Sequence, residues 1–178
     1  IMKEADRLQA LMSRLLAPHR MARPDHVNVH EVLERVRSVL IAEYQKAISI
    51  RRDYDVSLPL MFGDLEQLIQ AVLNIARNAA QALTESATPN PQIILRTRAA
   101  RQVVLARKRY RHAIELSIID NGPGVPPEIG ERVFYPLVSG REGGSGLGLT
   151  IAQNFVSQHN GTLTFESAPG RTCFTLLL

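Results

Sequence analysis

Residues 139–150 read SGREGGSGLGLT and contain five glycines in twelve positions, directly before an apolar run with helical spacing. Glycine lets the backbone approach a ligand closely and adopt positive φ, so a glycine cluster that opens a helix is a candidate phosphate cradle. A flexible surface loop is the alternative. The stretch is not a P-loop, because Leu149 and not a lysine follows Gly148. It is not a dinucleotide fingerprint either, since Gly144, Gly146 and Gly148 alternate after a segment without a strand pattern.

A long helical pattern lies upstream of the glycines. Asp64, followed three residues later by glutamine, predicts a capping box that opens a helix running to about Leu83. Asn74 and Asn78 are four residues apart and share a helix face, with Gln81 further along the same stripe. Asparagine is a poor helix former, and its carbonyl oxygen is a hard ligand suited to Mg²⁺. The alternative is a pair of solvent-facing or capping asparagines.

The third feature is DNGPG at residues 120–124, which directly follows an apolar strand pattern at 114–119. A carboxylate at a strand end, followed by glycines that bring the chain close, can accept a hydrogen bond from an exocyclic amine such as that of adenine. An ordinary turn uses the same residue types and is the alternative.

The remaining pattern predicts the fold class. Strands are clustered late in the chain and interspersed with helices, which favours an α+β two-layer sandwich over a doubly wound parallel sheet. Helices are expected at 1–17, around 32–40, 64–83 and 147–159, and strands at 48–54, 93–97, 114–119 and in a C-terminal hairpin over 162–178. Two prolines in residues 17–26 indicate a linker after the first helix.

Composition sets outer bounds on function. With 178 residues and 45% hydrophobic side chains, the chain can bury one core. Its net charge is 21 − 17 = +4, and the excess comes from a segment with no acidic residue. The basic residues of this segment are Arg96, Arg98, Arg101, Arg107, Lys108, Arg109 and Arg111. Without them the balance is 14 − 17 = −3, which argues against a general nucleic-acid surface.

Two further absences suggest the cellular location. A single cysteine, Cys173, cannot form an internal disulfide, and no apolar run approaches the length of a membrane span. We therefore expect a reducing, cytoplasmic location. The chain begins within a helical pattern, and we expect it to be part of a longer protein.

The order of the motifs resembles a known family. The chain resembles the ATP-binding domain of sensor histidine kinases, which belongs to the wider GHKL group. That domain has four motifs, called the N, G1, F and G2 boxes. In this chain they correspond, in that order, to LNIARNAAQA (73–82), DNGPG (120–124), Phe134 and GSGLGLTIA (144–152). The resemblance covers roughly residues 27–178 and implies an α/β sandwich that holds ATP between its helical layer and a lid. FYPLVSGREGGSGLGL, at residues 134–149, is similar to the soluble nitrogen-regulation sensor kinases of the NtrB type, which have a short lid.

The resemblance implies roles for the polar face of the long helix. Asn78 would ligate Mg²⁺ through its side-chain oxygen, and Asn74 would contact the phosphates or the metal shell. Many relatives carry a lysine where this chain has Gln81, which removes a cation from the phosphate site. Arg77 or Arg141 could compensate.

The resemblance also implies a base site and a phosphate site. Asp120 would accept from the adenine amino group, Gly122 and Gly124 would let the base enter, and Thr172 would supply an adenine-side hydroxyl. Phe134 is either lid-hinge packing or a ligand contact. The triphosphate would be lined, at the N-terminus of the last helix, by Gly144, Gly146, Leu147 and Gly148. Arg141 could reach the γ-phosphate or be an exposed loop arginine.

The position of Asn74 bears on the reaction. GHKL ATPases of the gyrase, Hsp90 and mismatch-repair type have a glutamate there, four residues before the metal asparagine, as general base on water. Asn74 cannot take a proton, so the resemblance implies phosphoryl transfer to an external nucleophile. In the family that nucleophile is a histidine on a helical dimerisation hairpin.

The chain's histidines do not match that acceptor. His30 and Glu31 give a superficial match, but an apolar helical pattern follows them and leads into the sandwich. The other histidines are His19, His26, His112 and His159. We expect the acceptor to be absent and the chain to bind ATP without phosphorylating itself. Residues 1–23 would be the second helix of the hairpin with its linker, and 24–178 the ATP-binding domain.

The resemblance also implies partners. These would be the acceptor histidine of the protein's own dimerisation domain, an NtrC-like response regulator and the PII signal protein, in a homodimeric full-length protein with no nucleic-acid or membrane partner. Two alternatives stay open: a GHKL ATPase, and a noncatalytic nucleotide-sensing or docking module in which the basic segment binds a partner. A solvated hairpin is the simpler interpretation of that segment.

Overall fold

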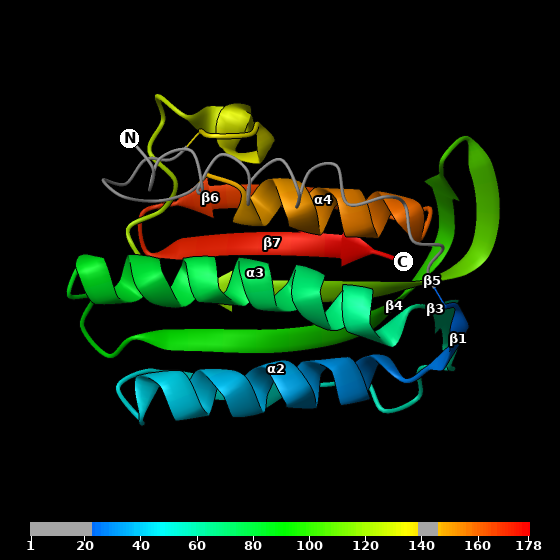
Figure 1. Cartoon of the computed structure of the whole chain (residues 1–178), viewed down its shortest axis with the longest axis horizontal. Helices are drawn as coiled ribbons and strands as arrows, with labels where there is room; N and C mark the ends of the chain where they lie inside the picture. The colour runs from blue at the N-terminus through cyan, green and yellow to red at the C-terminus, as the bar shows by residue number, and fades with distance from the viewer. Residues whose placement is uncertain (1–22, 139–145) are drawn as a thin grey trace, which may run out of the picture.

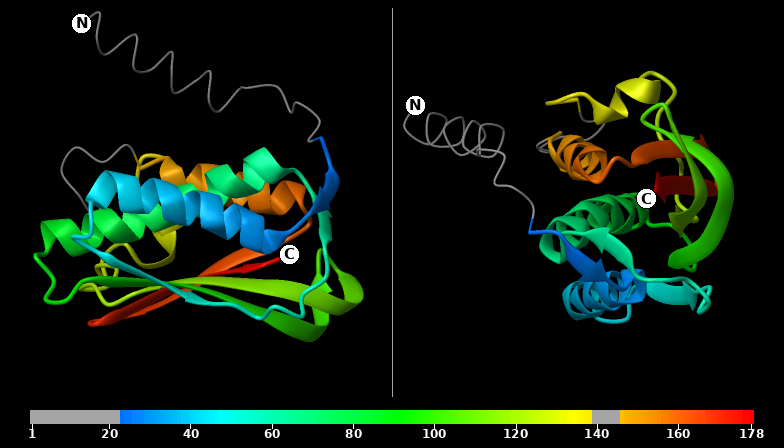
Figure 2. Two further views of the ribbon diagram at one scale, coloured as in Figure 1. Left: turned by 90° about the horizontal axis from the view of Figure 1, so that it is seen from below. Right: turned by 90° about the vertical axis from the view of Figure 1, so that its right-hand side faces the viewer.

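The computed structural model describes residues 23–138 and 146–178. It shows two layers, with three helices lying on one face of a twisted sheet and no described element covering the other face (Figures 1 and 2). The predicted α+β two-layer sandwich is therefore confirmed. The helix expected at 1–17, Arg141 and Gly144 lie outside the described residues.

The main sheet has five strands in the order β2-β4-β5-β7-β6. The strands are β2 (Ser49–Asp53), β4 (Gln92–Leu105), β5 (Lys108–Asp120), β6 (Thr162–Ala168) and β7 (Arg171–Leu177). β2 runs parallel to β4, and the other pairs are antiparallel. The strands predicted at 93–97 and 114–119 are parts of β4 and β5, which continue through the basic segment as one hairpin, as expected.

The three helices are α2 (Val29–Tyr44), α3 (Leu65–Glu85) and α4 (Gly148–Gln158). The core lies between them and the sheet, because alternate residues of the central strands face the helices. On the central helix α3, Ala71, Ala76 and Ala80 are fully buried, and these small side chains let the helix approach its neighbours closely. The buried residues Leu95 and Ile118 contribute about 2 kcal/mol each by leaving water.

Two elements have no counterpart in the sequence analysis. β1 (Asp25–Val27) pairs with β3 (Met61–Gly63) as a separate antiparallel ribbon, and a 3-10 helix, η1, spans Gly130–Phe134. Elements this short carry too few residues for a periodic pattern.

The N-terminus of α3 departs from the predicted capping box. Asp64 accepts a hydrogen bond from the Gln67 N–H at 3.0 Å, as expected for an N-cap. The reciprocal bond is absent, because the Asp64 N–H donates to Nε2 of His159, at 2.9 Å. The His159 Nδ1 then donates to the Phe155 carbonyl oxygen at 2.7 Å, so the C-terminus of α4 is fixed to the start of α3.

Candidate nucleotide site

A cavity of about 490 Å³ opens between α3, the loop after β5 and the start of α4. The residues that line it include most of those predicted from the motifs. From α3 and its end come Asn74, Arg77, Asn78, Ala79, Gln81, Ala82, Glu85 and Ser86; from the rest of the chain come Asp120, Pro123, Gly124, Val125, Pro126, Ile129, Val133, Val138, Gly146, Gly148, Leu149, Thr172 and Phe174.

Asp120 and Thr172 lie side by side at the cavity floor. They are register partners on β5 and β7, and they are only 5% and 4% exposed. The Asp120 Oδ1 accepts a hydrogen bond from the Gly122 N–H at 2.9 Å. A Cβ atom on Gly122 would lie 2.8 Å from that oxygen, so glycine is needed here for the loop to close on the carboxylate. Gly122 supports Asp120 and is not itself among the cavity-lining residues.

The loop after β5 is fixed to the β6–β7 hairpin. Gly124 has φ +91°, and a Cβ there would lie 3.1 Å from the Ala168 carbonyl oxygen. The next N–H, that of Val125, donates to the Ser167 Oγ at 2.7 Å, and this hydroxyl lies 3.2 Å from the Thr172 Oγ1. Ser167 was missed by the sequence analysis, because only the pairing of β6 with β7 brings it to this loop.

Asn74, Asn78 and Gln81 all reach the cavity from one side of α3, as their helical spacing predicted. The Asn74 Oδ1 accepts from the Gln70 Nε2 at 2.9 Å, and its Nδ2 donates to the Gly148 carbonyl oxygen at 3.2 Å. In this structure Asn74 therefore links α3 to the first turn of α4.

The charged groups at the cavity rim are paired. The Gln81 Nε2 donates to the Glu85 Oε1 at 2.7 Å. The Arg77 guanidinium forms an ion pair with Glu43 of α2, and the hydrogen bonds that it donates to the Glu43 carboxylate raise the pKa of Arg77. Glu85 and Ser86 were missed as lining residues, since no motif marks the last turn of α3.

Backbone geometry shapes the start of α4. Gly146 has φ +62°, and a Cβ there would lie 2.7 Å from the Leu137 carbonyl carbon. The Leu137 N–H donates to the Gly146 carbonyl oxygen at 3.1 Å. Leu147 is 2% exposed and is not among the lining residues, so its side chain packs inward while Gly146 and Gly148 border the cavity.

Phe134 packs against aromatic rings of the sheet. Its centroid lies 5.7 Å from that of Phe165 and 6.3 Å from that of Phe174, both at edge-to-face angles. The Thr150 Oγ1 donates to the Phe134 carbonyl oxygen at 2.9 Å, which joins α4 to η1. Phe134 does not line the cavity, which favours the packing role over ligand contact.

Within residues 23–138 and 146–178, no group of three or more His, Cys, Asp or Glu side chains could hold a metal ion by itself. Hard oxygen donors at the cavity are the amides of α3 and the carboxylates of Asp120 and Glu85. In the same ranges no helix is both long and apolar enough to cross a membrane.

Comparison with known proteins shows the family of the chain. Residues 63–178 match the family "Histidine kinase-, DNA gyrase B-, and HSP90-like ATPase". The whole chain is 48% identical to the sensory histidine kinase/phosphatase NtrB of Vibrio alginolyticus and 46% identical to that of Escherichia coli O157:H7. The chain spans about half the length of these curated relatives, 50% in each case.

Solved structures of sensor kinases share the fold. The mycobacterial sensor histidine kinase MprB is 27% identical, with a TM-score of 0.68 over 87% of this chain and 96% of that one. Full-length ShkA, solved in complex with AMPPNP, is 22% identical and has a TM-score of 0.75 over 98% of this chain and 36% of its own. Histidine kinase ThkA, in complex with the response regulator TrrA, is 19% identical, with a TM-score of 0.72 over 99% of this chain and 48% of its own. The resemblance predicted from the four motifs is confirmed, and the chain belongs to the histidine kinase-, DNA gyrase B- and HSP90-like ATPase family.

Proposed function

We propose that this chain is the ATP-binding catalytic part of an NtrB-like sensor histidine kinase of nitrogen regulation, which transfers the γ-phosphate of ATP to a histidine outside the chain. The observation that carries the proposal is the cavity, which has a buried carboxylate and hydroxyl at one end and glycine backbone at the other. The relatives of closely similar sequence are named sensory histidine kinase/phosphatase NtrB.

The two ends of the cavity suit the two ends of ATP. Asp120 and Thr172, both buried, can accept from and donate to the edge of an adenine. The start of α4, bordered by Gly146 and Gly148, can bind phosphates with backbone N–H groups and the helix dipole. Gly144 and Arg141 complete the proposed site from outside the described residues.

The amide oxygens that α3 presents to the cavity are donors that would suit Mg²⁺. Mg²⁺ usually takes one or two protein oxygens and fills its octahedron with phosphate oxygens and water. Asn78 would hold it through its amide oxygen, with Asn74 and Gln81 beside the phosphates. The ion would supply charge neutralisation of the transferred phosphate. The residues of the chain would orient the nucleotide and exclude water around it.

Calorimetric titration of ATP, with and without Mg²⁺, tests the site. We expect ATP binding to depend on Mg²⁺ and Asn78→Ala to weaken it by about 10- to 100-fold. Loss of a residue that only supports a metal ligand already lowers metal affinity by that factor. Asn154→Ala, at an exposed position of α4, is the matched control and should bind as the wild type does. Equal affinities for the two variants would contradict the metal role of Asn78.

Transfer is tested by supplying the acceptor. The chain, mixed with a separate dimerisation hairpin of an NtrB relative and γ-labelled ATP, should label the hairpin with an acid-labile, base-stable phosphate and leave itself unlabelled. Label on the chain alone would contradict the proposal that its histidines do not include the acceptor.

A GHKL ATPase is the second candidate. Its general base would occupy the position of Asn74, whose amide is already hydrogen bonded to Gln70 and Gly148 and cannot take a proton. Steady phosphate release by the chain alone, blocked by a nonhydrolysable analogue, would favour this candidate.

The same proposal extends to the whole protein. Residues 1–23 would be part of the dimerisation hairpin and its linker, residues 24–178 the ATP-binding domain, and the full protein a cytoplasmic homodimer. An NtrC-like response regulator and the PII signal protein would be its partners. The complex of ThkA with response regulator TrrA supports a regulator as partner in general.

A further inference from the structure

Residues 98–113 form a two-stranded ribbon that extends beyond the sheet. β2 stops pairing with β4 at Arg96, and β7 stops pairing with β5 at Glu115, with one further backbone pair between Leu178 and Ile114. Beyond these points β4 and β5 pair only with each other in the described part of the chain. The ribbon projects from the end of the sheet near β1 and β3 (Figure 1).

The ribbon carries a local excess of positive charge. Arg98 forms an ion pair with Asp53 at 2.8 Å, and the same carboxylate also pairs with Arg96. Its other basic side chains are Arg101, Arg107, Lys108, Arg109 and Arg111, and among the described residues none of these forms an ion pair with a carboxylate. The segment 96–111 contains no acidic residue that could compensate them.

The two outer edges of the ribbon differ. On β4, Gln102 has φ +53°, which interrupts that edge, and Gln102 and its counterpart Arg111 on β5 are both missing from the paired register. On β5, no residue from Lys108 to Ala113 has positive φ, so its backbone stays extended through Arg111 and its free edge has no left-handed residue. Regular backbone N–H and C=O groups without a strand neighbour are a template for another strand.

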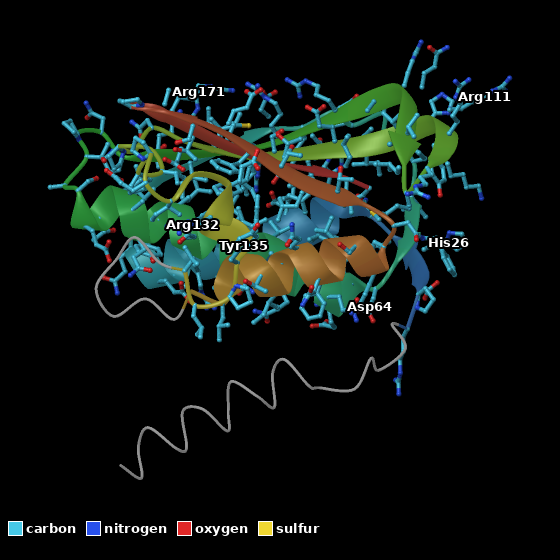
Figure 3. All side chains as sticks on the ribbon, turned by 90° about the horizontal axis from the view of Figure 1, so that it is seen from above. His26, Asp64, Arg111, Arg132, Tyr135 and Arg171 are labelled. Atoms are coloured by element: carbon cyan, nitrogen blue, oxygen red, sulfur yellow. The ribbon has the colours of Figure 1, made fainter. Side chains whose placement is uncertain are left out.

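The side chains along β5 alternate between the two faces of the ribbon. Ile114 and Leu116 face the helical core, so Arg109 and Arg111 lie on the opposite, uncovered face. Figure 3 shows Arg111 at the end of the molecule that also holds His26, far from Tyr135 and Arg132. Val104, 61% exposed, is the register partner of Arg109 and adds apolar surface.

We propose that the free edge of β5 between Lys108 and Ala113 binds an extended, carboxylate-rich segment of a partner protein by strand addition. Backbone hydrogen bonds to the edge would give affinity, and alternate carboxylates beside Arg109 and Arg111 would give specificity. A second copy of this ribbon does not fit, because like charges would lie opposite each other. Nucleic acids and lipids have no peptide backbone to complete the edge.

The proposed edge is independent of the nucleotide site. Asp120, at the cavity floor, is at the opposite end of β5, and no ribbon residue lines the cavity. Failure of the nucleotide proposal would leave this one standing, and the reverse also holds.

The test uses a fluorescent peptide of about eight residues, a typical strand length, in which glutamate alternates with valine and threonine. The fluorescence anisotropy of the peptide is measured with the wild-type chain and with the ribbon variant Arg109→Gln/Arg111→Gln. The control is Lys46→Gln/Arg171→Gln, which removes the same charge from exposed positions elsewhere. We expect binding that the ribbon variant weakens about tenfold and the control leaves unchanged, since each exposed ion pair contributes a modest factor. ATP affinity, measured in parallel, should be the same for all three proteins.

Two further probes separate strand addition from simple charge attraction. A peptide with glutamine in place of glutamate should bind weakly, and so should the acidic peptide with N-methyl groups on alternate residues, which cannot complete the edge. Equal binding of the N-methylated and unmodified peptides would overturn the proposal. Tighter binding of a short DNA duplex through the same two arginines, or no peptide binding at all, would also overturn it.

Discussion

The Asn74 side chain donates to the Gly148 carbonyl oxygen at 3.2 Å and so joins the middle of α3 to the first turn of α4. Its own oxygen is occupied by Gln70 at 2.9 Å. A residue expected from the motif to face phosphate thus also holds together the two helices that border the cavity. Any nucleotide contact by Asn74 would have to share its amide with these partners.

This link predicts unequal effects of two alanine substitutions. Asn74→Ala removes both hydrogen bonds and should lower the free energy of unfolding by about 1–2 kcal/mol, whereas Gln70→Ala removes one exposed bond and should lower it by at most about 0.5 kcal/mol. Urea denaturation of both variants measures the difference. Equal losses would show that the bond to Gly148 contributes nothing.

His30 provides a pH-dependent prediction. Its Nε2 is hydrogen bonded to the Thr97 Oγ1 at 2.9 Å, and this hydroxyl oxygen also accepts the Asp55 N–H at 2.9 Å. Burial lowers the pKa of His30, although Asp55 and Glu34 partly offset this. The unfolded chain, with a histidine pKa of about 6.5, therefore binds more protons than the folded chain just below that pH. Stability should be full above about pH 6.5 and fall as the pH decreases through the lower folded pKa.

The measurement compares denaturation from pH 7.5 to 5 for the wild type and His30→Gln. Subtracting the two curves cancels carboxylates such as Glu34, whose pKa the Arg52 hydrogen bond lowers and which titrates at lower pH. A difference that does not decrease with falling pH would contradict the assignment.

The sequence predicts the residues that line the candidate site better than it predicts the residues that support them. Helical periodicity placed Asn74, Asn78 and Gln81 on one face, and strand ends placed Asp120 at the floor, because local spacing determines both. The supports Ser167 and His159 have no local signal. His159 bonds Asp64 across 95 positions of sequence, and only the packing of α4 on α3 creates that contact.

The limits on the fold have the same origin. The five main strands were predicted from apolar local sequence, but β1 and β3 have only three residues each and find each other through tertiary packing. The capping box was predicted from Asp64 and Gln67. In the structure His159, at the end of α4, accepts the Asp64 N–H in place of the Gln67 side chain. Long-range partners decide such details, and a local pattern does not contain them.

The turn between β4 and β5 can be stabilised by substitution. Ala106 and Arg107 both have positive φ, 48° and 63°, the geometry of a type I′ turn that favours Asn-Gly. Ala106→Asn/Arg107→Gly should stabilise the ribbon by about 1 kcal/mol, because the left-handed conformation is strained for alanine and arginine and less so for asparagine and glycine. Hydrogen exchange of the amides around the turn should slow, and Arg107→Gln alone, which keeps the strain, should leave the rates unchanged. Faster exchange in the Asn-Gly variant would contradict the turn assignment.

Two glycines with positive φ allow the cost of backbone strain to be measured apart from the cost of a steric clash. Gly170 has φ +87° with nothing within 4 Å of a Cβ, whereas Gly146, at φ +62°, would place a Cβ 2.7 Å from the backbone of Leu137. Gly170→Ala should therefore cost only the strain, about 1 kcal/mol, and leave ATP affinity unchanged. Gly146→Ala should cost clearly more and also weaken ATP binding, because the segment at Leu137 must move away from the start of α4. Urea denaturation and ATP titration of both variants give the comparison, and equal behaviour would mean that the contact between Gly146 and Leu137 does not shape the site.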